Sequence, residues 1–229
     1  MKKKIIIFIV LALIAVSTFF VLKNRPGADE QNLQAMRDSI VSEPAVKTTA
    51  LTAEQIDKRV EDFRKTKDSL VTENFDNLQL INQIALYKQQ LGDLEGARIA
   101  WEYANIIRPQ NSLSFSNLAA LYHFDLKQYD KAEKNYLISI ANDPDDIPTI
   151  RNFFELYRDA IKDNSKAEAL LLRSIEQNPE AADLYSLLGR FYEETGNRDK
   201  AIEYYKKHLE LNPTNQAVKN AIARLEAAK

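Results

Sequence analysis

Residues 185–213 have the sequence YSLLGRFYEETGNRDKAIEYYKKHLELNP, and they carry apolar side chains at intervals of three and four residues. This spacing is typical of amphipathic helices. Gly196 and Asn197 interrupt the pattern with residues that favour a turn, and Pro213 ends it because proline cannot continue a helix. The stretch therefore predicts two helices joined by a short turn, that is, a helical hairpin.

The same pattern occurs four times along the chain. Each copy ends on a proline, and Pro109, Pro144, Pro179 and Pro213 are 35, 35 and 34 residues apart. In the last copy the recurring positions hold Tyr185, Leu188, Gly189, Tyr192, Ala201 and Tyr205. The two middle copies contain one extra residue, which we place in the turn between their helices.

These positions and this period resemble the tetratricopeptide repeat, whose 34-residue pattern has an aromatic, Leu, Gly, Tyr, then Ala, Phe and Pro. The resemblance covers about residues 75–213, and it implies an all-α, right-handed α-solenoid of about four helix-turn-helix repeats. Two residues depart from the pattern. Lys88 stands where the first copy should have an aromatic residue, and Phe154 stands where the third should have a small one. Helix packing around Phe154 should therefore loosen or shift.

The residues themselves give the physical reason for such a stack. Gly189 lacks a side chain and Ala201 has a small one, so the two helices of the last copy can approach closely. A single hairpin would leave its apolar face in water, so neighbouring copies must stack to stabilise the set. Flanking helices should close both ends, one within residues 52–74 and one within residues 214–229. The first of these begins with Thr52 and Gln55, which fit a capping box.

The N-terminal residues 1–23 are predicted to be a transmembrane signal-anchor. Residues 5–22 contain no charge, and as a helix they would span about 27 Å, close to the thickness of the hydrocarbon core of a bilayer. Three lysines precede them, which favours a cytoplasmic N-terminus and repeats outside the cytoplasm, at a bacterial inner membrane. Cleavage of a secretory signal after Ala15-Val16-Ser17, a buried soluble helix and a reversed topology are the alternatives.

Residues 24–51 are rich in polar side chains, and they contain Pro26, Gly27 and Pro44, which disfavour regular structure. We expect a polar flexible tether here. Leu33, Met36 and Ile40 share one helical face and would allow a short helix.

Composition excludes several kinds of function. The chain has no cysteine, so it has no disulfide, thiolate metal site or cysteine nucleophile. Its formal net charge is -2, whereas a nucleic-acid-binding domain is usually basic. The two histidines, His123 and His208, belong to no motif with metal-ligand spacing, and no phosphate-binding or nucleophile motif occurs. We therefore expect no cofactor, no metal, no nucleic acid and no enzymatic activity.

The family resemblance implies that the first helices of successive repeats line a groove that binds a protein or peptide. By register, the residues of this groove are Asn82, Gln89, Ser116, Asn117, His123, Arg151, Glu155, Arg158, Ser186, Arg190 and Glu193. Arg151 and Arg158 are seven residues apart and share a helix face, and Arg190 should lie beside them. Three guanidinium groups would suit a carboxylate or an acidic peptide, unless Glu155 and Glu193 pair with them.

The sequence thus predicts a membrane-anchored interaction scaffold whose groove binds a partner protein, for example in the assembly of an envelope complex. One alternative is a soluble secreted or periplasmic solenoid with a cleaved signal. The other is a regulatory subunit of an enzyme, in which His123 and the groove arginines bind a small anionic ligand.

Overall fold

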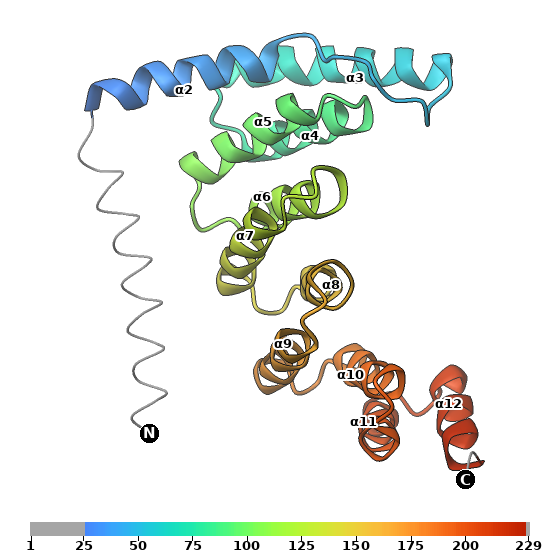
Figure 1. Ribbon diagram of the computed structural model, residues 1–229. Helices are drawn as coiled ribbons and strands as arrows, with labels where there is room; N and C mark the ends of the chain where they lie inside the picture. Colours follow the sequence, from blue (N-terminus) through green and yellow to red (C-terminus); the bar gives the residue numbers. More distant parts are fainter. Residues whose placement is uncertain (1–25, 228–229) are drawn as a thin grey trace. The chain divides into compact units, whose positions relative to one another are not determined.

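The computed structural model describes residues 26–227, and within that range all regular structure is helical (Figure 1). The described residues form two compact units, the first ending at Tyr103 and the second beginning at Ala104. None of the helices between residues 26 and 227 has the length and apolar character required to cross a bilayer. The predicted signal-anchor and the alternative cleavage site lie before this range, outside the described residues.

The first unit contains helices α2 (Pro26–Val41), α3 (Ala53–Thr72) and α4 (Leu78–Gln90), and α5 (Leu94–Ile107) begins in it. The capping box at the start of α3 is confirmed. The Gln55 backbone N–H donates to Thr52 Oγ1 at 3.3 Å, and the Thr52 N–H donates to Gln55 Oε1 at 2.9 Å. Helix α3 packs on α4 and buries Phe63 and Leu70 completely, so it covers the side of the first repeat as expected.

Residues 24–51, which we predicted to be a flexible tether, have a fixed structure from residue 26 onward. Ile40, on the apolar face of α2, is fully buried. The segment of residues 42–48 that follows, here called the strap, lies on the end of α4. The backbone N–H groups of Lys47 and Thr48 donate to the Leu91 carbonyl at 2.8 and 3.1 Å. Side chains hold the strap as well, because Glu43 pairs with Arg64 and Lys67 of α3 at 3.0 and 3.3 Å. The local sequence pattern gave no sign of these contacts between distant residues.

Lys88 explains why the first repeat departs from the pattern. Its side chain is fully buried, and Nζ donates to the Ser42 carbonyl of the strap at 2.9 Å. The same ammonium group pairs with Asp93 at 3.1 Å and lies 5.2 Å from the centre of the Phe63 ring. A buried charge is tolerated only with such partners. Lysine therefore replaces the aromatic residue because it binds the strap.

The second unit consists of three helical hairpins and a closing helix, each packed on the next (Figure 1). The second repeat comprises α6, η1 and α7, the third α8, η2 and α9, and the fourth α10 and α11. The elements are α6 (Ser112–Ala120), η1 (Leu121–Asp125), α7 (Tyr129–Asn142), α8 (Ile147–Glu155), η2 (Leu156–Ile161), α9 (Asn164–Gln177), α10 (Ala182–Glu194), α11 (Arg198–Leu211) and α12 (Gln216–Ala227). Helix α12 packs on α11 and buries Val218 and Ile222, as expected of a C-terminal capping helix.

The extra residue of the two middle repeats lies in the first helix rather than in the turn. Both first helices end in a π-helical segment, η1 and η2. In the fourth repeat the Asn197 N–H donates to the Tyr192 carbonyl five residues back, whereas in the second the Gln128 N–H reaches the Tyr122 carbonyl six residues back. A π-helical turn holds one residue more than an α-turn. The insertion is thus absorbed before the chain reverses.

Close helix approach in the fourth repeat depends on Gly189, as the sequence indicated. A Cβ atom at Gly189 would lie only 2.6 Å from Tyr205 Cδ1 on α11. The third repeat has Phe154 at this position, and α8 and α9 approach each other much less than α10 and α11 do. The Phe154 ring instead meets Phe191 of the fourth repeat edge-on, with centroids 5.8 Å apart. The predicted shift in packing is therefore confirmed.

Polar contacts also join consecutive repeats in the second unit. Tyr157 of the third repeat donates its hydroxyl to Glu133 of the second at 2.8 Å. Lys166 binds the same carboxylate at 2.9 Å and lies over the Tyr157 ring. The same three contacts recur one repeat later, among Tyr192, Glu168 and Lys200. Each carboxylate thus links its own repeat to the next.

Candidate protein-binding surface

The two groove residues predicted in the first unit lie on α4. Asn82 is buried, with 5% of its surface exposed, and its amide donates to the Leu78 carbonyl one turn earlier at 2.9 Å. Gln89 is half-buried near the end of the helix. The burial of Asn82 leaves little of it for a partner to contact.

The second repeat supplies Ser116 and Asn117 to the surface, but it does not supply His123. Ser116 and Asn117 are half-buried on α6, and the Ser116 hydroxyl lies 2.6 Å from the Thr149 hydroxyl of the third repeat. His123 was expected to face the groove, yet only 5% of it is exposed. It belongs to the π-helical segment η1, where the extra residue changes the direction of the side chains relative to an α-helix.

His123 lies among aromatic rings. It stacks on Phe124 with centroids 3.9 Å apart, and it meets Tyr129 and Tyr136 edge-on at 6.3 Å. Its Nδ1 atom is buried without a hydrogen-bond partner. Burial, reinforced by the positive charge of Lys127, lowers the pKa of His123 below its usual value, although Asp159 opposes this shift. A neutral, buried imidazole is poorly placed to bind an anionic ligand.

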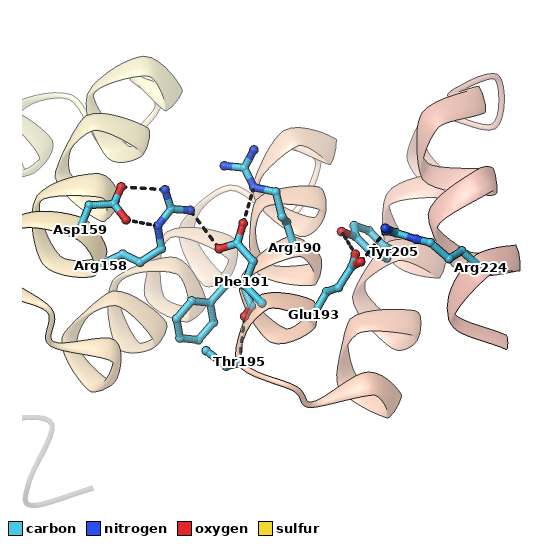
Figure 2. A network of polar contacts seen from close by, with 9 residues as sticks. Arg158, Asp159, Arg190, Phe191, Glu193, Thr195, Tyr205 and Arg224 are labelled. Carbon is cyan, nitrogen blue, oxygen red and sulfur yellow. Dashed lines mark hydrogen bonds and ion pairs between the residues drawn. The ribbon is translucent and has the colours of Figure 1, made fainter. Parts of the chain in front are cut away.

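The third and fourth repeats bring two of the predicted arginines together (Figure 2). Arg158 on η2 binds Asp159 through two parallel hydrogen bonds, of 2.6 and 2.7 Å, and it contacts Glu194 on α10 at 3.3 Å. Arg190 binds the other oxygen of Glu194 at 3.6 Å. The side chain of Arg158 is 20% exposed, whereas that of Arg190 is 50% exposed. Arg158 is thus firmly held in this network, whereas Arg190 is loosely held.

The arginines therefore have carboxylate partners, but mostly not the ones that we predicted. Glu155 is half-buried and acts on Arg158 only through its charge. Glu193 turns to the opposite side, where it accepts a hydrogen bond from Tyr205 at 3.0 Å and pairs with Arg224 of α12 (Figure 2). Ser186 donates to the Asp183 carbonyl of its own helix at 3.0 Å.

Arg151 stands apart from the other two arginines in its pairing. Its nearest carboxylate is Asp183 of α10, at 3.7 Å, and both side chains are largely exposed. The sequence did not indicate that Asp159, Asp183 and Glu194 are the carboxylates that pair with the arginines. Asp159 and Glu194 each directly follow a predicted groove residue, and Asp183 lies at the start of α10. Their spacing was visible, but which acid meets which arginine depends on packing between repeats.

An open pocket of about 420 Å³ adjoins this network. It is lined by Arg158, Asp159, Asn164, Phe191, Glu194 and Thr195. The hydrogen bonds from Arg158 hold the pKa of Asp159 below its usual value, so this carboxylate stays ionised. Among residues 26–227 no group of three or more acidic or histidine side chains is arranged to hold a metal ion. The pocket can therefore offer charge pairing and hydrogen bonds to a ligand.

Comparison with known proteins supports the repeat assignment. Residues 182–215 match the family model of the tetratricopeptide repeat. No curated protein matches the chain. The chain thus contains a tetratricopeptide repeat at the place where its sequence follows the pattern most closely.

Solved structures show the same fold. A tetratricopeptide repeat protein from Parabacteroides merdae superposes with a TM-score of 0.56 at 18% identity, over 85% of this chain and 72% of that one. MamA from Desulfovibrio magneticus RS-1 gives 0.53 at 17% identity, over 81% and 97%. YrrB, described as a protein with an unusual peptide-binding site, gives 0.51 at 17% identity, over 73% and 85%. The helices of this chain thus adopt the fold of tetratricopeptide-repeat proteins.

Proposed function

We propose that the protein is a non-enzymatic scaffold whose repeats bind a partner protein or peptide. The observation that carries this proposal is the surface formed by the first helices of the third and fourth repeats. There Arg151, Arg190 and Glu194 are each about half exposed, on helices whose other faces are fixed by packing. Exposed charged groups on a rigid scaffold are suited to recognition of another macromolecule.

The fold gives independent support. YrrB, which shares the fold, is described as having a peptide-binding site. The alternative of a small anionic ligand has less support, because His123 is buried and the arginines are already paired with carboxylates. We therefore favour a protein partner over an anionic metabolite.

The proposal is tested by charge reversal on the surface. In the variant Arg151→Glu with Glu194→Arg, two half-exposed charges change sign, so we expect capture of the partner from native membranes to be lost while helicity and melting stay unchanged. Lys134→Glu with Arg173→Glu is the matched control, because both residues are exposed on second helices. Equal capture by wild type, variant and control would remove Arg151 and Glu194 from the binding surface.

We further propose that residues 5–22 anchor the protein to a membrane, with the repeats outside the cytoplasm, and that the scaffold serves the assembly of an envelope complex. The apolar length of this segment and the three lysines before it support the proposal. A mature N-terminus near residue 18, found by mass spectrometry, would instead establish a cleaved signal. An inactive phosphatase fused to the C-terminus would contradict the orientation.

A further inference from the structure

The pocket at the junction of the third and fourth repeats has more hydrogen-bond acceptors than donors to offer a ligand. Its lining contains two carboxylates, from Asp159 and Glu194, but only one guanidinium group. Thr195 donates its hydroxyl proton to the Phe191 carbonyl at 2.9 Å, so its oxygen is left to accept. A carboxylate can accept about four hydrogen bonds, and these two use only part of that capacity.

The guanidinium group of Arg158 is not available to an incoming anion. Asp159 binds it through two parallel bonds, Glu194 through a third, and the group lies 5.0 Å from the centre of the Phe154 ring. Bidentate pairs of this kind are among the stronger polar contacts in proteins. An anion would have to compete with two carboxylates of the same chain.

A cation, in contrast, meets a competitor that is easily displaced. Arg190 reaches Glu194 at 3.6 Å from the same helix, and both side chains are about half exposed. Ion pairs with this exposure contribute little free energy. The chain therefore already places one loosely held cation beside the pocket, and a ligand cation could take its place on Glu194.

We propose that this pocket receives a basic side chain, lysine or arginine, of the partner protein. The inference rests on the proposed function and makes it more specific, since it replaces the expected acidic ligand with a basic one. A donor-only group complements the acceptors of Asp159, Glu194 and Thr195. The volume of about 420 Å³ is in the range of pockets that hold small groups.

The test uses five-residue peptides, Gly-Ala-X-Ala-Gly, in which X is Lys, Arg, Gln or Glu, together with the free diamine cadaverine. Each is titrated into the full chain in mild detergent, and the backbone amide signals of Asn164 and Thr195 are followed by NMR. We expect saturable shifts with the Lys and Arg peptides, weaker binding of cadaverine, and no saturation with the Gln and Glu peptides. Equal binding of cadaverine would assign the pocket to free amines and overturn a protein ligand.

Three variants test the expected direction of the change in affinity for the Lys peptide. Glu194→Gln should weaken binding of the Lys peptide about threefold, because one carboxylate is lost. Arg190→Ala should strengthen it about threefold, because the competing cation is removed. Glu193→Gln is the control and should change nothing, since Glu193 faces Tyr205 and Arg224 instead of the pocket.

The opposite pattern would overturn the inference. If the Glu peptide binds and Arg190→Ala weakens its binding, the pocket prefers an anionic side chain. If no peptide gives saturable shifts, the pocket binds none of these side chains. Either result leaves the proposed function standing as long as the variant Arg151→Glu with Glu194→Arg still loses capture of the partner. Loss of that dependence, with normal binding of the Lys peptide, would contradict the proposed function and not the pocket.

Discussion

The first and fourth repeats use the same template positions for different purposes. In the fourth repeat, Tyr192 occupies the aromatic position and contacts the third repeat through Glu168. In the first repeat, Lys88 occupies that position and binds the strap through the Ser42 carbonyl. The same position thus connects neighbouring repeats in the fourth repeat, whereas in the first repeat it connects the repeat to the strap.

The turns of these two repeats differ in the same way. Gly92 and Gly196 both have positive φ angles, of 86° and 80°. A Cβ atom at Gly92 would lie 2.9 Å from the Thr48 nitrogen of the strap, whereas one at Gly196 would meet nothing within 4 Å. The comparison teaches that departures from a repeat pattern can mark where other parts of the chain dock.

The largest expected effect comes from closing the space at Gly189 in the fourth repeat. Gly189→Leu would drive the new side chain into the Tyr205 ring, since even a Cβ would lie 2.6 Å from it. We expect a loss of about 3 kcal/mol in the free energy of unfolding, measured by urea denaturation. Ser186→Leu, on the half-buried face of the same helix, is the control and should cost far less. An unchanged midpoint for Gly189→Leu would contradict the close approach of α10 and α11.

The next effect tests the role of Lys88 in the first repeat. Lys88→Met would remove the hydrogen bond to Ser42 and leave Asp93 without its ammonium partner, at a cost of about 2–3 kcal/mol. Hydrogen exchange should show loss of protection at the amides of Lys47 and Thr48. Lys67→Met, which removes a more exposed contact to the strap residue Glu43, should leave that protection intact. Full protection in Lys88→Met would show that the strap does not depend on the lysine.

A smaller effect compares the two turn glycines directly. Gly196→Ala should cost about 1 kcal/mol, because alanine is strained at positive φ. Gly92→Ala adds a clash with the strap backbone to the same strain and should cost about 1 kcal/mol more. Equal unfolding free energies for the two variants would indicate that the strap is not in contact with the turn.

The last prediction concerns pH and the second repeat, where a π-helical segment buries His123. Because burial lowers the pKa of this histidine in the folded protein, the unfolded chain binds a proton more readily. The neutral His123 side chain therefore makes its full contribution to the free energy of unfolding above the pKa of the unfolded chain, about 6.5. This contribution is lost as the pH falls toward the lower pKa of the folded protein. Denaturation at pH 7.5 and pH 5 should show a smaller change in His123→Phe than in the wild type. The same change in both proteins would assign the pH dependence to other groups.

Much of the fold could be predicted from local sequence. The spacing of the prolines predicted the repeats, and Gly189 predicted the close approach of two helices within one hairpin. The capping box at the start of α3 was predictable because it involves residues only three positions apart. The C-terminal capping helix was predictable for the same reason, from the apolar face that includes Val218 and Ile222.

Contacts between distant residues could not be predicted in the same way. The strap is bound through backbone N–H groups and through Glu43, whose partners Arg64 and Lys67 lie 21 and 24 residues further along the chain. The burial of His123 follows from a π-helical segment that the residue count alone did not locate. The carboxylate partner of each arginine depends on how one repeat packs on the next. The sequence correctly indicated that Arg158 and Arg190 lie close together. It suggested Glu155 and Glu193 as their partners, whereas both arginines contact Glu194.

The claim that the first helices of the repeats bind another protein can be tested most directly by photocrosslinking. A photoreactive amino acid is placed at Ser186 or Arg190 on α10, or at Glu176 on α9 as a control, and the full chain is irradiated in native membranes. We predict that a discrete adduct of the same partner forms from positions 186 and 190 and not from position 176. Adducts from position 176 alone, or none from any position, would contradict the account.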